Sequence, residues 1–299
     1  MTYNSPDGLI VTNHHCAFGA VARNSTPERN LVEDGFVARS RADELPGRGM
    51  IVRVLEGFED VTDRIAPELP EDELKRIREI ERRESAIVAE CETQAGHRCY
   101  VARFDDGLPY APIAGDAGPP QRRFVLFDSF EIHDVRVVAA PPRSVGEYGG
   151  EVDNWHWPRH TNDFSFIRAY VGPGGSQAEY ADENVPYRPA RWLEVSPGGV
   201  AKGDLVFVMG YPWSTERYMT AAEIEEQQEW YYPLRLEMFG EWISELEAAA
   251  ERSAEAAILV SATLKGIHNA RSHARGMIDA LHRSGLLGMR RAEEAEFRT

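Results

Sequence analysis

Two patterns of hydrophobic and polar positions follow one another along the chain, and the change falls near residue 220. Before it, short apolar runs such as GLIVT and GMIVRVLEGF alternate with turns rich in Gly, Pro, Asn and Asp, which is typical of β-strands. Further runs of this kind are CYVARF, RRFVLFDSFEIHDVRVVAAP, DFSFIRAYV and DLVFVMGYP, with EDVTDRI as a weaker candidate. Many short strands separated by turn signals predict a β-barrel or a β-sandwich.

One amphipathic helix, near residues 70–94, interrupts these strands. Its apolar residues recur at helical spacing among Glu, Arg and Lys, and acidic residues fill its first turn, where the helix dipole favours negative charge. After Thr220 the sequence is rich in Ala, Glu, Leu and Arg, and strand signals almost disappear. We therefore expect a β-rich region over residues 1–219, with one inserted helix, and the start of a helical domain over residues 220–299.

Composition and charge exclude several classes of function. The chain is 42% hydrophobic and 10% aromatic, which is the composition of a globular protein. Its net charge of -16 repels phosphate backbones and anionic lipids, so we expect no nucleic-acid partner. No run of about 18 or more uncharged apolar residues occurs, so we also expect no membrane span.

The first residues resemble the second half of a β-hairpin whose first half is missing. SPDG is typical of a tight turn, and the strand-like run LIVT follows it directly. No basic region or apolar segment of a signal peptide precedes them. We expect the sequence to be a piece of a longer protein.

The segment VTNHHCAFGA places His14, His15 and Cys16 side by side after a predicted strand. Three interpretations compete: a zinc site completed by His160, the base of a nucleophilic enzyme, or a histidine pair that merely ends a strand. Adjacent residues of a strand point to opposite faces, so His14 and His15 cannot easily share a metal. We expect no metal site and interpret His14 as structural.

A second element favours the enzyme. His15 and Cys16, after a strand ending in Thr12, resemble the T-A-A-H-C element of trypsin-like serine proteases, in which the histidine is the general base. Asp163 opens the run DFSFIRAY, as the aspartate that orients the base does in that fold. Such a carboxylate fixes the imidazole tautomer and stabilises the imidazolium. Asp153 is the competing candidate for this role.

The resemblance extends to a particular family. The strings SPDGLIVTNHHC, EDGFVA, ELPGRGMIVRVL, APPRSVGEYGGEVDNWHWPRHTNDFSFIRAYV, ENVPY and MGYPWSTERY are similar to the bacterial dipeptidyl-peptidase family that includes dipeptidyl peptidases seven and eleven. The resemblance implies a chymotrypsin-like double β-barrel, incomplete in this chain, with an inserted helical domain that covers the active site. It also implies a serine protease that releases dipeptides from free peptide N-termini in the periplasm without a cofactor, and a homodimer in the full-length form.

The same resemblance implies roles for individual residues. His15 is the base, Asp163 is its orienting carboxylate, and Asn154 and Trp155 hold the free α-amino group of the substrate. An amide or carbonyl oxygen accepts hydrogen bonds from an ammonium, and an indole face attracts a cation, so these residue types suit that task. Trp157 is interpreted as a core aromatic residue.

The catalytic serine is not identified. Neither G-N-S-G-[SG]-P nor G-D-S-G-G-P occurs in the sequence, and in the family this element follows the helical domain. Ser214 lacks flanking glycines and is interpreted as part of a loop. We expect the 299-residue chain alone to be inactive. The alternative is a non-catalytic peptide-binding fragment or pseudoenzyme.

The three cysteines suggest one disulfide. Cys91 and Cys99 are close enough in sequence to close a small loop, which suits an oxidising periplasm, although two ordinary thiols remain the alternative. In trypsin-like barrels the cysteine that matches Cys16 bonds to a cysteine on the preceding strand, and no such strand is present in this sequence.

Overall fold

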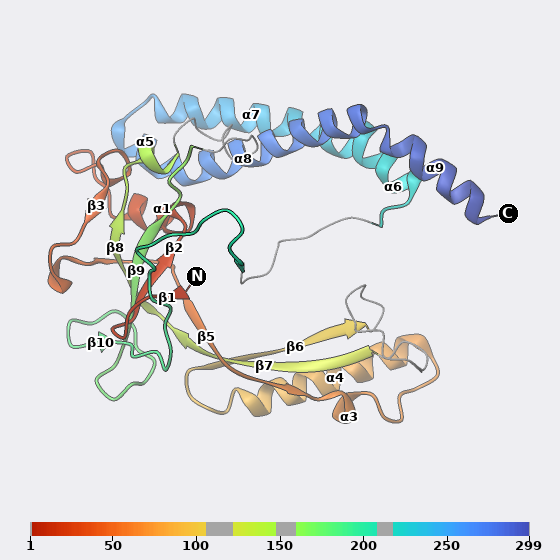
Figure 1. Cartoon of the computed structure of the whole chain (residues 1–299), viewed down its shortest axis with the longest axis horizontal. Coiled ribbons are helices and arrows are strands. Elements are labelled where there is room, and N and C mark those ends of the chain that lie inside the picture. Colours follow the sequence, from red (N-terminus) through yellow and green to blue (C-terminus); the bar gives the residue numbers. More distant parts are fainter. Residues whose placement is uncertain (1, 106–121, 148–159, 208–217, 299) are drawn as a thin grey trace.

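The computed structural model describes residues 2–105, 122–147, 160–207 and 218–298, and contains two antiparallel β-sheets and a layer of long helices (Figure 1). The seven strands of the larger sheet are β1 (Thr2–Tyr3), β2 (Leu9–Thr12), β3 (Phe36–Val37), β4 (Leu45–Pro46), β8 (Asp134–Ala140), β9 (Ser165–Val171) and β10 (Val185–Pro186). They follow the order β1-β2-β9-β8-β3, with β10 paired to β9 and β4 paired to β8. Within the described residues this is an open sheet.

The central strands of the larger sheet carry the main core. Side chains alternate between the two faces of a strand, so every second residue of β2 and of the first half of β9 is buried. Ile10, Ile167 and Ala169 meet there with Ile132 from the neighbouring sheet. A second cluster joins Phe18 to Val137. Helix α1 (His14–Arg23) supplies Ala17 to the first cluster and Phe18 to the second, so the core fixes α1 against the sheet.

The smaller sheet forms a separate layer with one helix on it. Its strands pair in the order β5 (Val52–Asp60), β7 (Arg122–Ile132) and β6 (His97–Asp105). Helix α4 (Glu73–Cys91) packs on this sheet through Ile80 and Ile87, and the Cys91–Cys99 disulfide joins the end of α4 to β6. His133 alone separates β7 from β8, so a single residue links the two sheets.

Helices occupy most of the described residues from 220 onward. They are α6 (Ala221–Glu226), the π-helical turn η3 (Gln227–Tyr231), α7 (Tyr232–Ala250), α8 (Ala254–Ser284) and α9 (Leu286–Phe297). The remaining short helices are α2 (Leu31–Asp34), η1 (Arg41–Asp43), α3 (Thr62–Ile65) and α5 (Arg143–Gly146). None of the described helices is long and apolar enough to cross a membrane.

The helical layer contacts the larger sheet through α8 and α1 (Figure 1). Lys265 of α8 forms a nearly buried ion pair with Glu147, and its ammonium lies 4.7 Å from the centre of the Phe18 ring of α1. A cation is attracted both to a carboxylate and to an aromatic face. These contacts anchor α8 beside the N-terminal turn of α1.

Two strand predictions are wrong, and a third is not met in its described residues. The first half of the N-terminal hairpin is not missing, because β1 pairs antiparallel with β2. The run EDVTDRI contains the end of β5 and then α3, because the Asp60 carboxylate accepts the Thr62 backbone N–H at 2.9 Å and turns the chain. In DLVFVMGYP, residues 204–207 form no strand, and Leu205 and Phe207 are more than 80% exposed. Apolar content predicts a strand there, but a strand requires a hydrogen-bonding partner, and the described residues supply none at this segment.

Core packing by Ile132 gives a testable expectation. Ile132 is fully buried in the main core, so Ile132→Ala should lower the free energy of unfolding by about 2–5 kcal/mol. Ile51→Ala is the matched control, because Ile51 is 45% exposed and one residue from the start of β5. Urea denaturation measures both. Equal losses in the two variants would contradict the assignment of the core.

Candidate active site

Asn13 separates the end of β2 from the start of α1, so the two histidines lie in the first turn of a helix. The prediction that both lie at the end of a strand is therefore wrong. The polar NHH sequence follows directly on the apolar strand, and the Ala- and Val-rich segment after it continues as a helix packed on the core. Successive residues then diverge around the helix axis instead of alternating across a sheet.

His14 and His15 nevertheless have opposite environments. His14 is buried, with its ring edge-to-face to Phe18 at 5.6 Å and against Gly146, where a Cβ atom would lie only 2.6 Å from the ring. Burial lowers the pKa of His14, which keeps its imidazole neutral. The side chain of His15 is 55% exposed. Only His15 is accessible to a substrate.

The register of β2 against β9 brings Asp163 to His15. Thr12 is paired with Ser165 in the antiparallel ladder, so the residues after Thr12 lie beside those before Ser165. His15 Nδ1 is 2.7 Å from Asp163 Oδ2, and the His15 backbone N–H donates to Asp163 Oδ1 at 3.0 Å. The Asp163 carboxylate thus fixes both the ring and the backbone of His15. We call His15 and Asp163 the dyad.

Asn13 is a third member of this group that the sequence analysis did not single out. Its Nδ2 donates to Asp163 Oδ2 at 3.1 Å and to the Asp163 backbone oxygen at 3.2 Å. The signal in the sequence was an amide placed between a strand and a helix, which is the N-cap position. That position predicts a bond to the helix, and here the side chain contacts Asp163 instead.

Electrostatic coupling within the dyad shifts the pKa values of both groups. The Asp163 carboxylate, and secondly the Cys16 side chain, raise the pKa of His15 to about 10 against the effect of partial burial. Burial alone would raise the pKa of Asp163, but the ring and backbone hydrogen bonds of His15 lower it to about 2. Hydrogen bonding to His15 also lowers the pKa of the Cys16 thiol, which is free and exposed.

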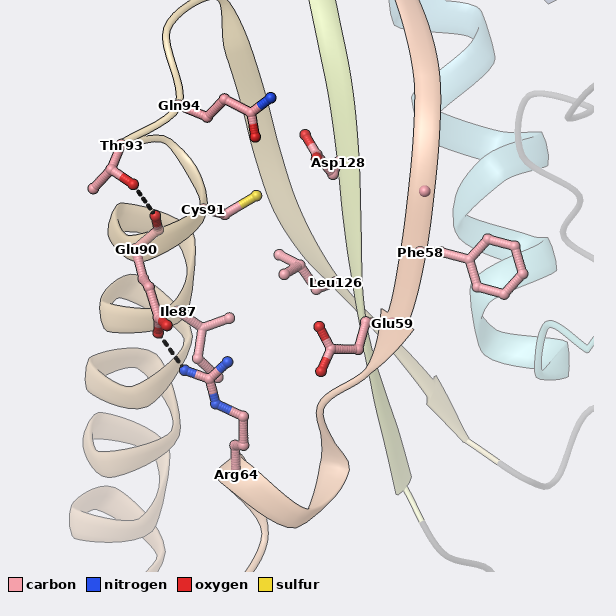
Figure 2. Close-up of a pocket in the computed structure, with 11 residues that line it drawn as sticks. Phe58, Glu59, Arg64, Ile87, Glu90, Cys91, Thr93, Gln94, Leu126 and Asp128 are labelled. Atoms are coloured by element: carbon pink, nitrogen blue, oxygen red, sulfur yellow. Dashed lines mark hydrogen bonds and ion pairs between the residues drawn. The ribbon is translucent and has the colours of Figure 1, made fainter.

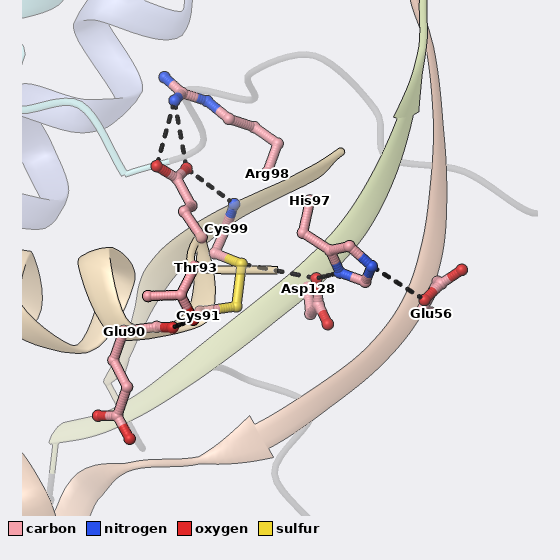
Figure 3. The surroundings of a disulfide bond; sticks show 9 residues. Glu56, Glu90, Cys91, Thr93, His97, Arg98, Cys99 and Asp128 are labelled. Atoms are coloured by element: carbon pink, nitrogen blue, oxygen red, sulfur yellow. Dashed lines mark hydrogen bonds and ion pairs between the residues drawn. A yellow bond between two sulfur atoms is a disulfide. The ribbon is translucent and has the colours of Figure 1, made fainter. Parts of the chain in front are cut away.

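The zinc site considered in the sequence, with His14, His15, Cys16 and His160 as ligands, is not assembled within the described residues. The groups of three possible metal ligands in the described residues lie elsewhere. One group contains Cys91 and Cys99, whose sulfurs are bonded to each other, with Asp128 (Figure 3). In the other, His97 Nδ1 is 2.7 Å from Asp128 and Nε2 is 3.7 Å from Glu56 (Figure 3). Both ring nitrogens of His97 thus already face carboxylates.

A pocket of about 450 Å³ lies between α4 and the smaller sheet, lined by none of the dyad residues (Figure 2). The Arg64–Glu90 ion pair lies at its edge, with Glu59 and Asp128 on the strand side. Its lining residues include no histidine or serine that could form a base and nucleophile pair. The dyad therefore remains the candidate active site.

Other predicted site residues lie outside the described part of the structure. These are Asn154 and Trp155 of the substrate clamp, together with Asp153, Trp157 and Ser214. The structure therefore tests neither the clamp nor the competing aspartate. Of the predicted residues that are described, it brings together His15 and Asp163, and separately Cys91 and Cys99.

Comparison with known proteins identifies the family. The sequence model of the peptidase S46 family matches residues 3–299, which is nearly the entire sequence. The chain belongs to the peptidase S46 family.

The curated relatives that the chain matches are named dipeptidyl-peptidases. The chain is 37% identical over 298 residues to the Asp/Glu-specific dipeptidyl-peptidase of Shewanella putrefaciens, covering 99% of this chain and 39% of the relative. It is 35% identical over 297 residues to dipeptidyl-peptidase 7 of Porphyromonas gingivalis, covering 98% of this chain and 40% of that protein. The chain therefore spans about two fifths of the length of these relatives.

A solved structure has a similar fold. The crystal structure of Porphyromonas endodontalis DPP11 in complex with the dipeptide Arg-Asp superposes with a TM-score of 0.82 at 33% sequence identity. The match covers 98% of this chain and 41% of that chain. The arrangement of sheets and helices is thus the one found in that part of DPP11.

The dyad predicts the effect of Asp163→Asn on His15. Loss of the carboxylate charge should move the pKa of His15 from about 10 toward 6.5, because the carboxylate is the largest cause of the upward shift. A pH titration of the His15 ring resonances by NMR measures this pKa. Asp72→Asn is the control, since that carboxylate caps α4 on the other sheet. An unchanged His15 titration in Asp163→Asn would contradict the dyad.

The same pair predicts a pH window for stability. The folded-state pKa of Asp163, about 2, lies below the ordinary aspartate value of 3.8, so its contribution to stability is lost as the pH falls through 2. The folded-state pKa of His15, about 10, lies above 6.5, so its contribution is complete below pH 6.5 and lost as the pH rises through 10. The loss of stability in Asp163→Asn should therefore be largest between pH 3.8 and pH 6.5. Urea unfolding across pH measures it, and a loss independent of pH would contradict the coupling.

Proposed function

We propose that this chain supplies the base and its orienting carboxylate to a serine-type dipeptidyl aminopeptidase. The observation that carries the proposal is the 2.7 Å contact between His15 Nδ1 and Asp163 Oδ2 in a member of the peptidase S46 family. The relatives named above are dipeptidyl-peptidases, which supports the release of dipeptides from free peptide N-termini.

The proposed chemistry uses the two nitrogens of His15 differently. Asp163 accepts from Nδ1–H, so the proton that the His15 imidazolium loses is the one on Nε2, and the pKa of about 10 places that loss at alkaline pH for this chain alone. Once neutral, the ring carries its lone pair on Nε2, where it can take the proton of a nucleophile. The resulting imidazolium is stabilised by Asp163 and returns the proton to the leaving amine. A serine in a segment beyond these 299 residues would provide the nucleophile, and the backbone N–H groups beside it would form the oxyanion hole.

The proposed fold of the whole protein is a chymotrypsin-like double β-barrel with an inserted helical cap. The seven-stranded antiparallel sheet supports this, because its pairing places His15 and Asp163 beside each other. The exposed apolar side chains of Leu205, Val206 and Phe207 also support it, since such a segment is stabilised when it pairs as a strand. The helices from Ala221 onward would begin the cap.

Location and partners belong to the same proposal. The Cys91–Cys99 disulfide supports an oxidising compartment such as the periplasm. Peptides with a free N-terminus would be held by Asn154 and Trp155, a role that rests on the family resemblance. Homodimerisation of the full-length form rests on the same resemblance.

The test uses the uninterrupted protein that contains residues 1–299. It should release dipeptides from a peptide with a free N-terminus and not from its N-acetylated form, as measured by chromatography and mass spectrometry. His15→Ala should lower kcat by about 10³-fold or more, as loss of a catalytic base does. His282→Ala is the control, because His282 is exposed on α8.

Two results would contradict the proposal. One is full activity in His15→Ala. The other is release of dipeptides by the 299-residue chain alone, since the proposal places the nucleophile outside it. Binding of free but not acetylated peptides, without hydrolysis by the whole protein, would instead favour a non-catalytic peptide-binding protein.

A further inference from the structure

Asn13 occupies the N-cap of α1 but does not cap it. Its backbone is extended, as an N-cap requires, yet its side chain accepts no hydrogen bond from the helix. Four other N-cap side chains in the described chain do accept a backbone N–H of their own helix: Asn30, Asp72, Thr220 and Ser253. Asn30 is the closest comparison, because it is the same residue type and accepts from Glu33 N–H.

The side chain of Asp163 caps α1 in place of Asn13. The backbone N–H of His15, the second residue of α1, donates to Asp163 Oδ1 instead of to Asn13. A carboxylate suits a helix N-terminus, where unpaired N–H groups and the helix dipole favour negative charge. One carboxylate oxygen of Asp163, Oδ1, is thereby fixed to the helix that carries His15.

The side chain of Asn13 fixes the other carboxylate oxygen, Oδ2. Its amide donates to Oδ2, the oxygen that also contacts the His15 ring, and to the backbone oxygen of Asp163. The first contact sets the rotation of the carboxylate, and the second ties down the main chain just before β9. Asp163 is therefore held from three directions.

We propose that Asn13 is a positioning residue. Its side chain donates hydrogen bonds to Asp163 instead of capping α1, and so holds Asp163 in the orientation that directs the His15 imidazole. The catalytic part of this inference rests on the proposed function, while the holding of Asp163 does not. An asparagine amide is required because it is a neutral donor of the right length. Serine would be too short to bridge to the carboxylate, and aspartate would bring a second negative charge and no donor.

The first experiment measures Asp163 in the 299-residue chain. Asn13→Ser removes the donor, and a serine at this position can cap α1, so the helix is retained. The pKa of the Asp163 carboxyl should then rise from about 2 toward 3.8, as followed by NMR of the carboxyl carbon. Asn30→Ser, which keeps the ordinary cap of α2, should leave the Asp163 titration unchanged.

The second experiment measures catalysis in the uninterrupted protein. Asn13→Ser should lower kcat by about 10- to 100-fold, the effect expected when a reacting group is displaced by ~1 Å, and should leave KM unchanged. Asn13→Asp has the same shape without the donor and should be impaired at least as much. A purely structural role in α1 predicts instead that Asn13→Ser retains the wild-type kcat.

The results separate the two proposals. An unchanged Asp163 titration in Asn13→Ser overturns the inference about Asn13, whatever the activity of the protein. A shifted titration with no fall in kcat confirms that Asn13 holds Asp163 and overturns its role in catalysis. Full activity in His15→Ala contradicts the proposed function and leaves the contacts of Asn13 with Asp163 standing.

Discussion

The antiparallel pairing of β2 with β9 is the constraint on which the candidate site depends. It places Thr12 opposite Ser165, and only in this register do the residues after one strand meet those before the other. A slip of β9 by one residue would move Asp163 by about 3.3 Å and turn the buried face of β9 outward. Burial of Ile10 and Ile167 in one core prevents that slip. The core thus fixes the geometry of a polar site at its edge.

Helix α1 completes the positioning of the site residues that the larger sheet brings together. Because α1 starts one residue after the end of β2, His14 points into the protein and His15 points out of it. The N-terminus of α1 also supplies a backbone donor for Asp163, so one carboxylate orients an imidazole and caps a helix. The Lys265–Glu147 ion pair adds a contact from the helical layer close to this turn.

Several parts of this arrangement could be predicted from the sequence. Apolar runs predicted strands at β2, β5 and β9, and the motifs around His15 and Asp163 predicted that these two residues form a pair. The helical state of His14 and His15 could not, because their short polar segment follows a strand and carries little periodicity. The exposed state of Leu205 and Phe207 depends on which strands are present to pair with them, which local sequence does not specify. The contact of Asn13 with Asp163 depends on strand register, a long-range property.

The close approach of Gly146 to His14 has a consequence for how this protein can vary. A Cβ atom at position 146 would lie 2.6 Å from the imidazole, which is shorter than any ordinary contact, so a residue other than glycine there requires the buried His14 ring to move. Substitution of Gly146 is thus conditional on the residue at position 14, although neither residue takes part in the proposed chemistry. Among homologues, a residue larger than glycine at position 146 should occur together with a residue other than histidine at position 14, whereas glycine at 146 is compatible with either.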